Sequence, residues 1–67
     1  MNYQNVTIPE GAALLTEIQV RHLLQVSRGT LLKLAADNVL RPVRIGRSVR
    51  WRRADVNNYI ASLTASL

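Results

Sequence analysis

Two helix-start signals stand eleven residues apart in this chain of 67 residues. The hydroxyl of Thr16 can cap a helix, and Gln19, three positions later, can reach back to the Thr16 amide, which is a capping box. This pair predicts a helix over residues 17–24. Ser27 can cap a second helix, which should end near Asn38.

Only Gln25 and Val26 separate the first predicted helix from the second cap. Two short helices joined this tightly cannot lie flat and antiparallel, so they must turn sharply, as in a helix-turn-helix. Leu31, Leu34 and Ala35 share one face of the second helix and predict its buried side. A generic helical hairpin is the alternative interpretation.

The stretch "RPVRIGRSVRWRR" (residues 41–53) predicts a β-hairpin, because its apolar residues alternate with polar ones within each arm. A two-residue turn at Gly46–Arg47 would pair Arg44 with Val49 and mix apolar and charged side chains on each face. A three-residue loop, Gly46–Arg47–Ser48, would place every apolar side chain on one face. We therefore predict the three-residue loop, with one face formed by Val43, Ile45, Val49 and Trp51.

The other face of this hairpin is expected to be strongly cationic. Residues 41–53 contain six arginines and no acid, and the net charge of the whole chain is +5. In the predicted register Arg44, Arg50 and Arg52 share one face, with Arg47 at the tip. Like charges side by side destabilise a strand pair, and bound phosphates would relieve that repulsion. The segment therefore indicates nucleic-acid binding, with a merely solubilising basic face as the alternative.

A third helix is predicted to start between Arg53 and Asp55 and to cover the inner face of the hairpin. Its apolar residues recur at helical spacing: Val56, Tyr59, Ile60, Leu63 and Leu67. Residues 1–13 show no period and predict an arm, ordered only if Tyr3, Val6 or Ile8 enters a groove. The expected domain covers residues 14–67.

The sequence indicates no active site, no metal site and no membrane-spanning segment. The chain has no cysteine and a single histidine, His22, and its four acids are scattered, so we expect neither an enzyme nor a cofactor or metal site. Apolar runs are far shorter than the roughly 18 residues of a membrane span, and the first residues lack the pattern of a signal peptide. A cytoplasmic protein of a prokaryote or phage is expected.

Helix, tight turn, helix, two-stranded wing and helix make a mostly α winged helix-turn-helix with a small β-hairpin. The segments "LLTEIQVRHLLQVSRGTLLKL" and "PVRIGRSVRWRRADVNNYI" resemble the small DNA-binding domains of phage excisionases and AlpA-type regulators, in the MerR-like superfamily. The likeness runs from about Leu14 to Ile60, and "VSRGTL" and "RIGRSVRWRR" are its most specific parts.

Three residues depart from the pattern of this family. Gln25 replaces the usual glycine of the turn, which costs about 1 kcal/mol if the position needs a left-handed backbone. Arg21 stands in place of an alanine packed between the helices, so it should extend outward or hold the helices further apart. Leu32 stands in place of a tyrosine near the DNA backbone, and that contact is not transferred.

The resemblance implies that the second helix enters the major groove and that the wing grips the flanking backbone or minor groove. Arg28 can make paired hydrogen bonds to a guanine edge, Gly29 permits close approach, and Arg47 suits the minor groove. Hydroxyls and helix amides suit phosphates. The expected DNA-binding residues are Ser27, Arg28, Gly29, Thr30, Lys33, Arg44, Arg47, Ser48, Arg50 and Arg52.

An excisionase, which binds and bends an attachment site to direct an integrase, is the function that this pattern favours. One short helix buries too little DNA surface for high specificity alone, so cooperative self-association on double-stranded DNA is expected, possibly beside an integrase. The alternatives are an AlpA-like transcription regulator of a mobile element and a DNA-docking subunit of a packaging or replication machine. An RNA-binding domain is disfavoured, because no exposed aromatic platform for unpaired bases is predicted.

Overall fold

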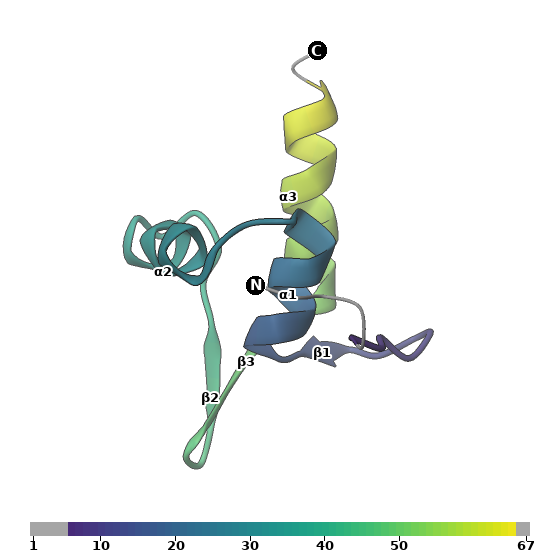
Figure 1. Ribbon diagram of the computed structural model, residues 1–67, viewed down its shortest axis with the longest axis vertical. Coiled ribbons are helices and arrows are strands. Elements are labelled where there is room, and N and C mark those ends of the chain that lie inside the picture. Colours follow the sequence, from purple (N-terminus) through teal and green to yellow (C-terminus); the bar gives the residue numbers. More distant parts are fainter. Residues whose placement is uncertain (1–5, 66–67) are drawn as a thin grey trace.

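The computed structural model describes residues 6–65, and these residues form three helices and three short strands. Helix α1 crosses in front of α3, α2 lies to one side, and the β2–β3 hairpin extends away from the helices (Figure 1). This is the predicted mostly α winged helix-turn-helix. The elements in chain order are β1 (Leu14–Leu15), α1 (Glu17–Leu24), α2 (Arg28–Ala36), β2 (Val43–Ile45), β3 (Ser48–Arg52) and α3 (Arg53–Ala65).

The predicted capping box fixes the start of α1. The Thr16 amide donates to Gln19 Oε1 at 2.9 Å, and the Gln19 amide donates to Thr16 Oγ1 at 3.3 Å. The helix spans Glu17–Leu24, which are the predicted bounds. Ser27 caps α2, where its Oγ accepts from the Thr30 amide at 3.2 Å. Both helices therefore begin where their local sequence signals place them.

The turn between α1 and α2 depends on a left-handed residue. Gln25 has φ 54° and ψ 48°, and its amide donates to the Arg21 carbonyl. A side chain in this conformation costs about 1–2 kcal/mol, because its Cβ crowds the following carbonyl oxygen. The strain expected from the glutamine at this position is therefore present.

Gln25→Gly is expected to stabilise the domain by about 1 kcal/mol. The substitution removes the left-handed strain of about 1–2 kcal/mol, and the greater chain entropy of glycine offsets about 0.5–1 kcal/mol of that gain. Denaturant unfolding of the two proteins measures the difference. Asn38→Gly is the matched control: Asn38 has φ 58°, but asparagine tolerates this region, so its gain should be smaller. A Gln25→Gly protein that is no more stable than the parent would contradict this account of the turn.

A two-residue turn joins the strands of the hairpin, so the predicted three-residue loop over residues 46–48 is wrong. Ile45 lies opposite Ser48 in the ladder. Gly46 has φ 59°, whereas Arg47 is outside the left-handed region. A positive φ at the first central residue alone is the pattern of a type II′ turn, which matches the right-handed twist of paired strands.

This register also divides the hairpin faces differently from the prediction. Arg44 lies opposite Val49, so the inner face that carries the buried Trp51 also carries an arginine. Ile45 lies on the outer face and is 54% exposed. The single face of four apolar side chains is therefore wrong. Because the hairpin extends away from the helices (Figure 1), its tip has no core against which a second apolar pair could be buried.

The arginines of the hairpin occupy both faces. Arg50 pairs with Val43, and Arg52 pairs with Leu14 of β1, all on the outer face. Arg44 does not share that face, contrary to the prediction. Each of these arginines has an uncharged cross-strand neighbour, so the expected crowding of like charges across the ladder does not arise.

The core lies where the two helices of the turn meet β3 and α3. Its buried apolar residues are Leu15, Val20, Leu31, Leu40, Trp51 and Val56. Helix α3 begins at Arg53, within the predicted range, and Tyr59 and Ile60 pack against this core. Leu63 is 50% exposed, and the predicted core position Leu67 lies outside the described residues.

Residues 6–13 lie against the rest of the fold. Ile8 packs against the core cluster. Arg53 holds this segment through two hydrogen bonds, one from its amide to the Ala13 carbonyl at 2.9 Å and one from Nη1 to the Pro9 carbonyl at 3.2 Å. The short strand β1 that follows was not expected from the sequence. Tyr3, another residue expected to anchor the arm, lies outside the described residues.

Candidate nucleic-acid interface

The first turn of α2 is exposed at each of its predicted contact residues, Ser27, Arg28, Gly29 and Thr30. The hydroxyls of Ser27 and Thr30 lie 3.1 Å apart and share a hydrogen bond. A Cβ built on Gly29 would meet only Ser27 Oγ, at 4.0 Å. Packing within the fold therefore does not require glycine at this position, although glycine weakens a helix.

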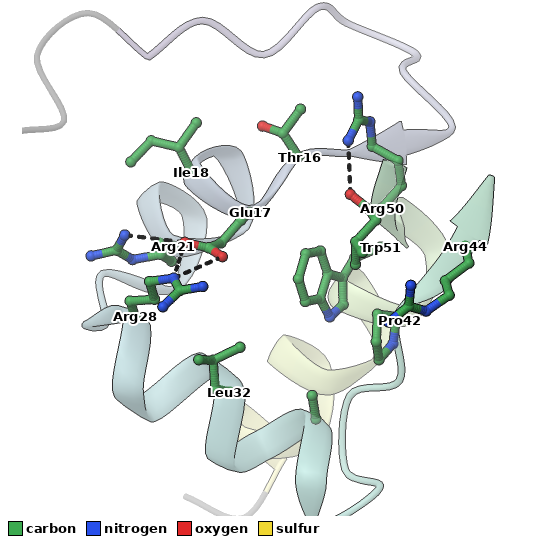
Figure 2. A pocket seen from close by; sticks show the side chains of 12 residues that line it. Thr16, Glu17, Ile18, Arg21, Arg28, Leu32, Pro42, Arg44, Arg50 and Trp51 are labelled. Atoms are coloured by element: carbon green, nitrogen blue, oxygen red, sulfur yellow. Dashed lines mark hydrogen bonds and ion pairs between the residues drawn. The ribbon is translucent and has the colours of Figure 1, made fainter. Parts of the chain in front are cut away.

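Arg28 is held by an acid from the preceding helix. Its Nε donates to both carboxylate oxygens of Glu17, at 3.2 and 3.1 Å, and its side chain is 63% exposed. Figure 2 shows the two side chains meeting where α1 and α2 lie close together. The sequence did not predict this contact, because the partners are eleven positions apart and a left-handed turn lies between them.

Lys33 lies further along α2 and is 78% exposed. Its Nζ lies 3.3 Å from Asp37 Oδ2, one turn later, which is an ordinary exposed ion pair. An exposed pair of this kind contributes little to stability, so a phosphate can compete for the ammonium.

The wing, defined as residues 43–52, projects away from the helices (Figure 1) and carries predicted site residues from its tip at Arg47 to its base at Arg52. Arg47 and Ser48 are exposed at the turn, and Arg44 and Arg52 are exposed on opposite faces. Arg50 is half-buried, and its Nη1 donates to the Val49 carbonyl at 2.8 Å. The wing therefore presents cations on two sides and at its end.

A cleft between the helices and the wing brings the two groups of predicted residues together. Arg28 and Leu32 border it from α2, and Arg44 and Arg50 border it from the wing. Figure 2 shows Trp51 between them. Lys33, Arg47 and Arg52 do not line this cleft. Arginines from the helices and the wing thus border a concave surface, which concentrates positive potential there.

Arg21 also lines this cleft, and of the two placements predicted for its side chain the outward one is wrong. Its side chain is only 4% exposed. Nη1 lies 3.5 Å from Glu17 Oε2, and Nε has no hydrogen-bond partner among the described residues. A buried guanidinium with one long contact and an unsatisfied donor is costly. Glu17, one helical turn earlier, supplies its compensating charge.

A helix-turn-helix whose second helix is exposed beside a basic wing defines a class of DNA-binding domains. A family model described as "Helix-turn-helix domain" matches residues 14–64 of the chain. The chain belongs to this family, which includes the excisionase and AlpA-type small DNA-binding domains. The helix-turn-helix domain supports sequence-specific DNA binding, and the family is typically non-enzymatic.

No curated protein and no solved structure matches the chain. Within residues 6–65, no group of three or more histidine, aspartate or glutamate side chains is placed to hold a metal ion. None of the helices described for this chain is long and apolar enough to cross a membrane.

Proposed function

We propose that α2 enters the major groove of double-stranded DNA while the wing contacts the flanking backbone. The observation that carries this proposal is the shared cleft, where Arg28 of α2 faces the same concavity as Arg44 of the wing. An α-helix fits the major groove, and a guanidinium fits the guanine edge there. Cations on both faces of the wing can reach phosphates on either side of a groove.

Within this family, we propose an excisionase: a protein that coats and bends an attachment site so that an integrase removes the element. A module with one short recognition helix buries about 600–1,000 Å² of surface on DNA. Such an area limits its specificity, so several copies must bind together or beside a larger partner. Cooperative binding to repeated sites next to an integrase meets that need.

Arg28→Ala is expected to lower the preference for one or two base pairs by about 1–3 kcal/mol, because it removes a bidentate base contact. Arg47→Ala should instead weaken binding to all sequences to a similar degree, since an arginine at the wing tip would contact the backbone or the minor groove, where little sequence information is read. Selection of sites from random duplexes, repeated with each variant, separates the two effects. If Arg28→Ala keeps the full sequence preference, α2 is not the element that contacts the bases.

An excision assay tests the particular role. A plasmid carries the two attachment sites of the mobile element that encodes the protein. It is incubated with the integrase of that element, with and without this protein. Excision that depends on the protein, accompanied by bending of the attachment site, supports an excisionase. Bound DNA without excision, together with altered transcription from a neighbouring promoter, would favour the AlpA-like regulator. Binding to a larger packaging or replication protein without either effect would favour a docking subunit.

A further inference from the structure

Among the described residues that line the cleft between the helices and the wing, Glu17 is the only acid. It touches two arginines of that cleft, Arg28 at 3.1 Å and Arg21 at 3.5 Å, and its own side chain is 33% exposed. An acid at a DNA-binding surface repels phosphates and therefore opposes affinity. Because Glu17 lies beside the arginine that is proposed to contact a base, we expect it to make a contribution to binding that offsets this loss of affinity.

The geometry of the contact indicates what that role is. Both hydrogen bonds that Arg28 donates to Glu17 come from Nε, so they leave the two Nη groups of Arg28 for another partner. These Nη groups form the end of the guanidinium that can donate two parallel bonds to the O6 and N7 of guanine. Glu17 can thus keep its contact while Arg28 binds a base.

We propose that Glu17 is a positioning residue that fixes Arg28 in the orientation needed to bind guanine. This inference rests on the proposed contact of Arg28 with a base. An unrestrained arginine loses side-chain freedom when it binds, whereas one already held by a carboxylate loses less. An unrestrained arginine can also turn to a neighbouring phosphate, which raises affinity for every sequence alike. Glu17 therefore raises specificity rather than affinity.

The experiment must separate the loss of the contact with Arg28 from the loss of the contact with Arg21, because Glu17 also compensates the buried charge of Arg21. Arg21→Met retains an unbranched apolar stem and removes that charge, and replacing a buried ion by an apolar residue of similar volume is often neutral or stabilising. Glu17→Gln is then introduced into the Arg21→Met protein. Asp37→Asn in the same background is the matched control, because it removes one acid at the end of α2 and its ion pair with Lys33 without touching Arg28.

Dissociation constants are measured for the selected site, for the same site with its guanine pair changed, and for random duplex. Glu17→Gln is expected to reduce the preference for the guanine pair by about 2- to 12-fold. Its affinity for random duplex should be unchanged or higher. Asp37→Asn should leave the preference unchanged. Equal losses on all three duplexes would make Glu17 a purely structural residue and would overturn the proposal, as would an unchanged preference.

A measurement on the unsubstituted protein covers the case in which the double variant does not fold. The Arg28 Nε proton, assigned by its loss in Arg28→Ala, should exchange slowly with solvent in the free protein and remain protected in the specific complex. Loss of that protection on binding would overturn the inference. If Arg28→Ala itself keeps the sequence preference, the proposed function fails first, and the two failures remain distinguishable.

Discussion

Trp51→Ala is expected to unfold the domain at ambient temperature. The indole is 2% exposed and lies in the core cluster, opposite Leu15 of β1 in the sheet. Truncation of a buried aromatic residue costs about 3–5 kcal/mol, because the removed contacts leave a cavity that the fold cannot close. A domain of this size has only a few kcal/mol of stability, so the loss is comparable with the total. Circular dichroism during thermal unfolding measures it.

Two neighbouring variants make this result interpretable. Trp51→Phe should remain folded, since the indole Nε1 has no hydrogen-bond partner among the described residues and its loss breaks no bond. Arg50→Ala should also remain folded, because Arg50 lies on the outer face of the same strand, but it should bind DNA more weakly. A folded Trp51→Ala protein that only loses DNA binding would mean that the indole stacks on DNA instead of filling the core.

The sequence predicted the helices well because their start signals are local. Thr16 and Gln19 act within one turn, and Ser27 caps its own helix, so each signal works without tertiary context. The buried position of Trp51 also followed from the alternation in its strand. The start of α3 was predicted within two residues, because its apolar spacing resumes directly after the hairpin.

The predicted hairpin register is wrong because it assumes that all four apolar side chains are buried, whereas the tip of the hairpin has no core beside it. Grouping every apolar side chain on one face assumes that a core underlies the whole hairpin. Here the inner half of β3 pairs with β1 at Trp51, whereas the tip extends beyond the helices (Figure 1). Near the tip the backbone of Gly46 decides the register, since glycine allows the tight type II′ turn.

Contacts between residues far apart in the chain also could not be predicted from the sequence. Strand β1 has only two residues, Leu14–Leu15, and exists because β3 offers its free edge. The burial of Arg21 depends on the crossing of α1 and α2 and on Glu17 as its partner. Likewise, the contact between Glu17 and Arg28 has no helical spacing, because it spans the turn. The sequence could therefore predict Arg28 as a site residue, but not the acid that holds it.

DNA binding is expected to weaken steeply as salt increases. If Lys33 and four wing arginines (Arg44, Arg47, Arg50 and Arg52) each neutralise one phosphate, the logarithm of the association constant should fall against the logarithm of salt with a slope of about −4.5. Raising salt from about 50 to about 200 mM should therefore reduce affinity by roughly 500-fold. Fluorescence anisotropy with a labelled duplex, repeated across this range, measures the slope.

Single substitutions show which cations contribute to that slope. Arg47→Ala should reduce its magnitude by about 1, because an exposed guanidinium at the wing tip is free to contact a phosphate. Arg53→Ala is the matched control from the same basic segment: its Nη1 donates to the Pro9 carbonyl, so the change should lower stability and leave the slope intact. A slope near zero on duplex DNA would exclude the proposed interface. An equal slope and affinity on heparin would mean that the wing binds polyanions without selecting a duplex, and the cleft beside Arg28 would then have no role in recognition.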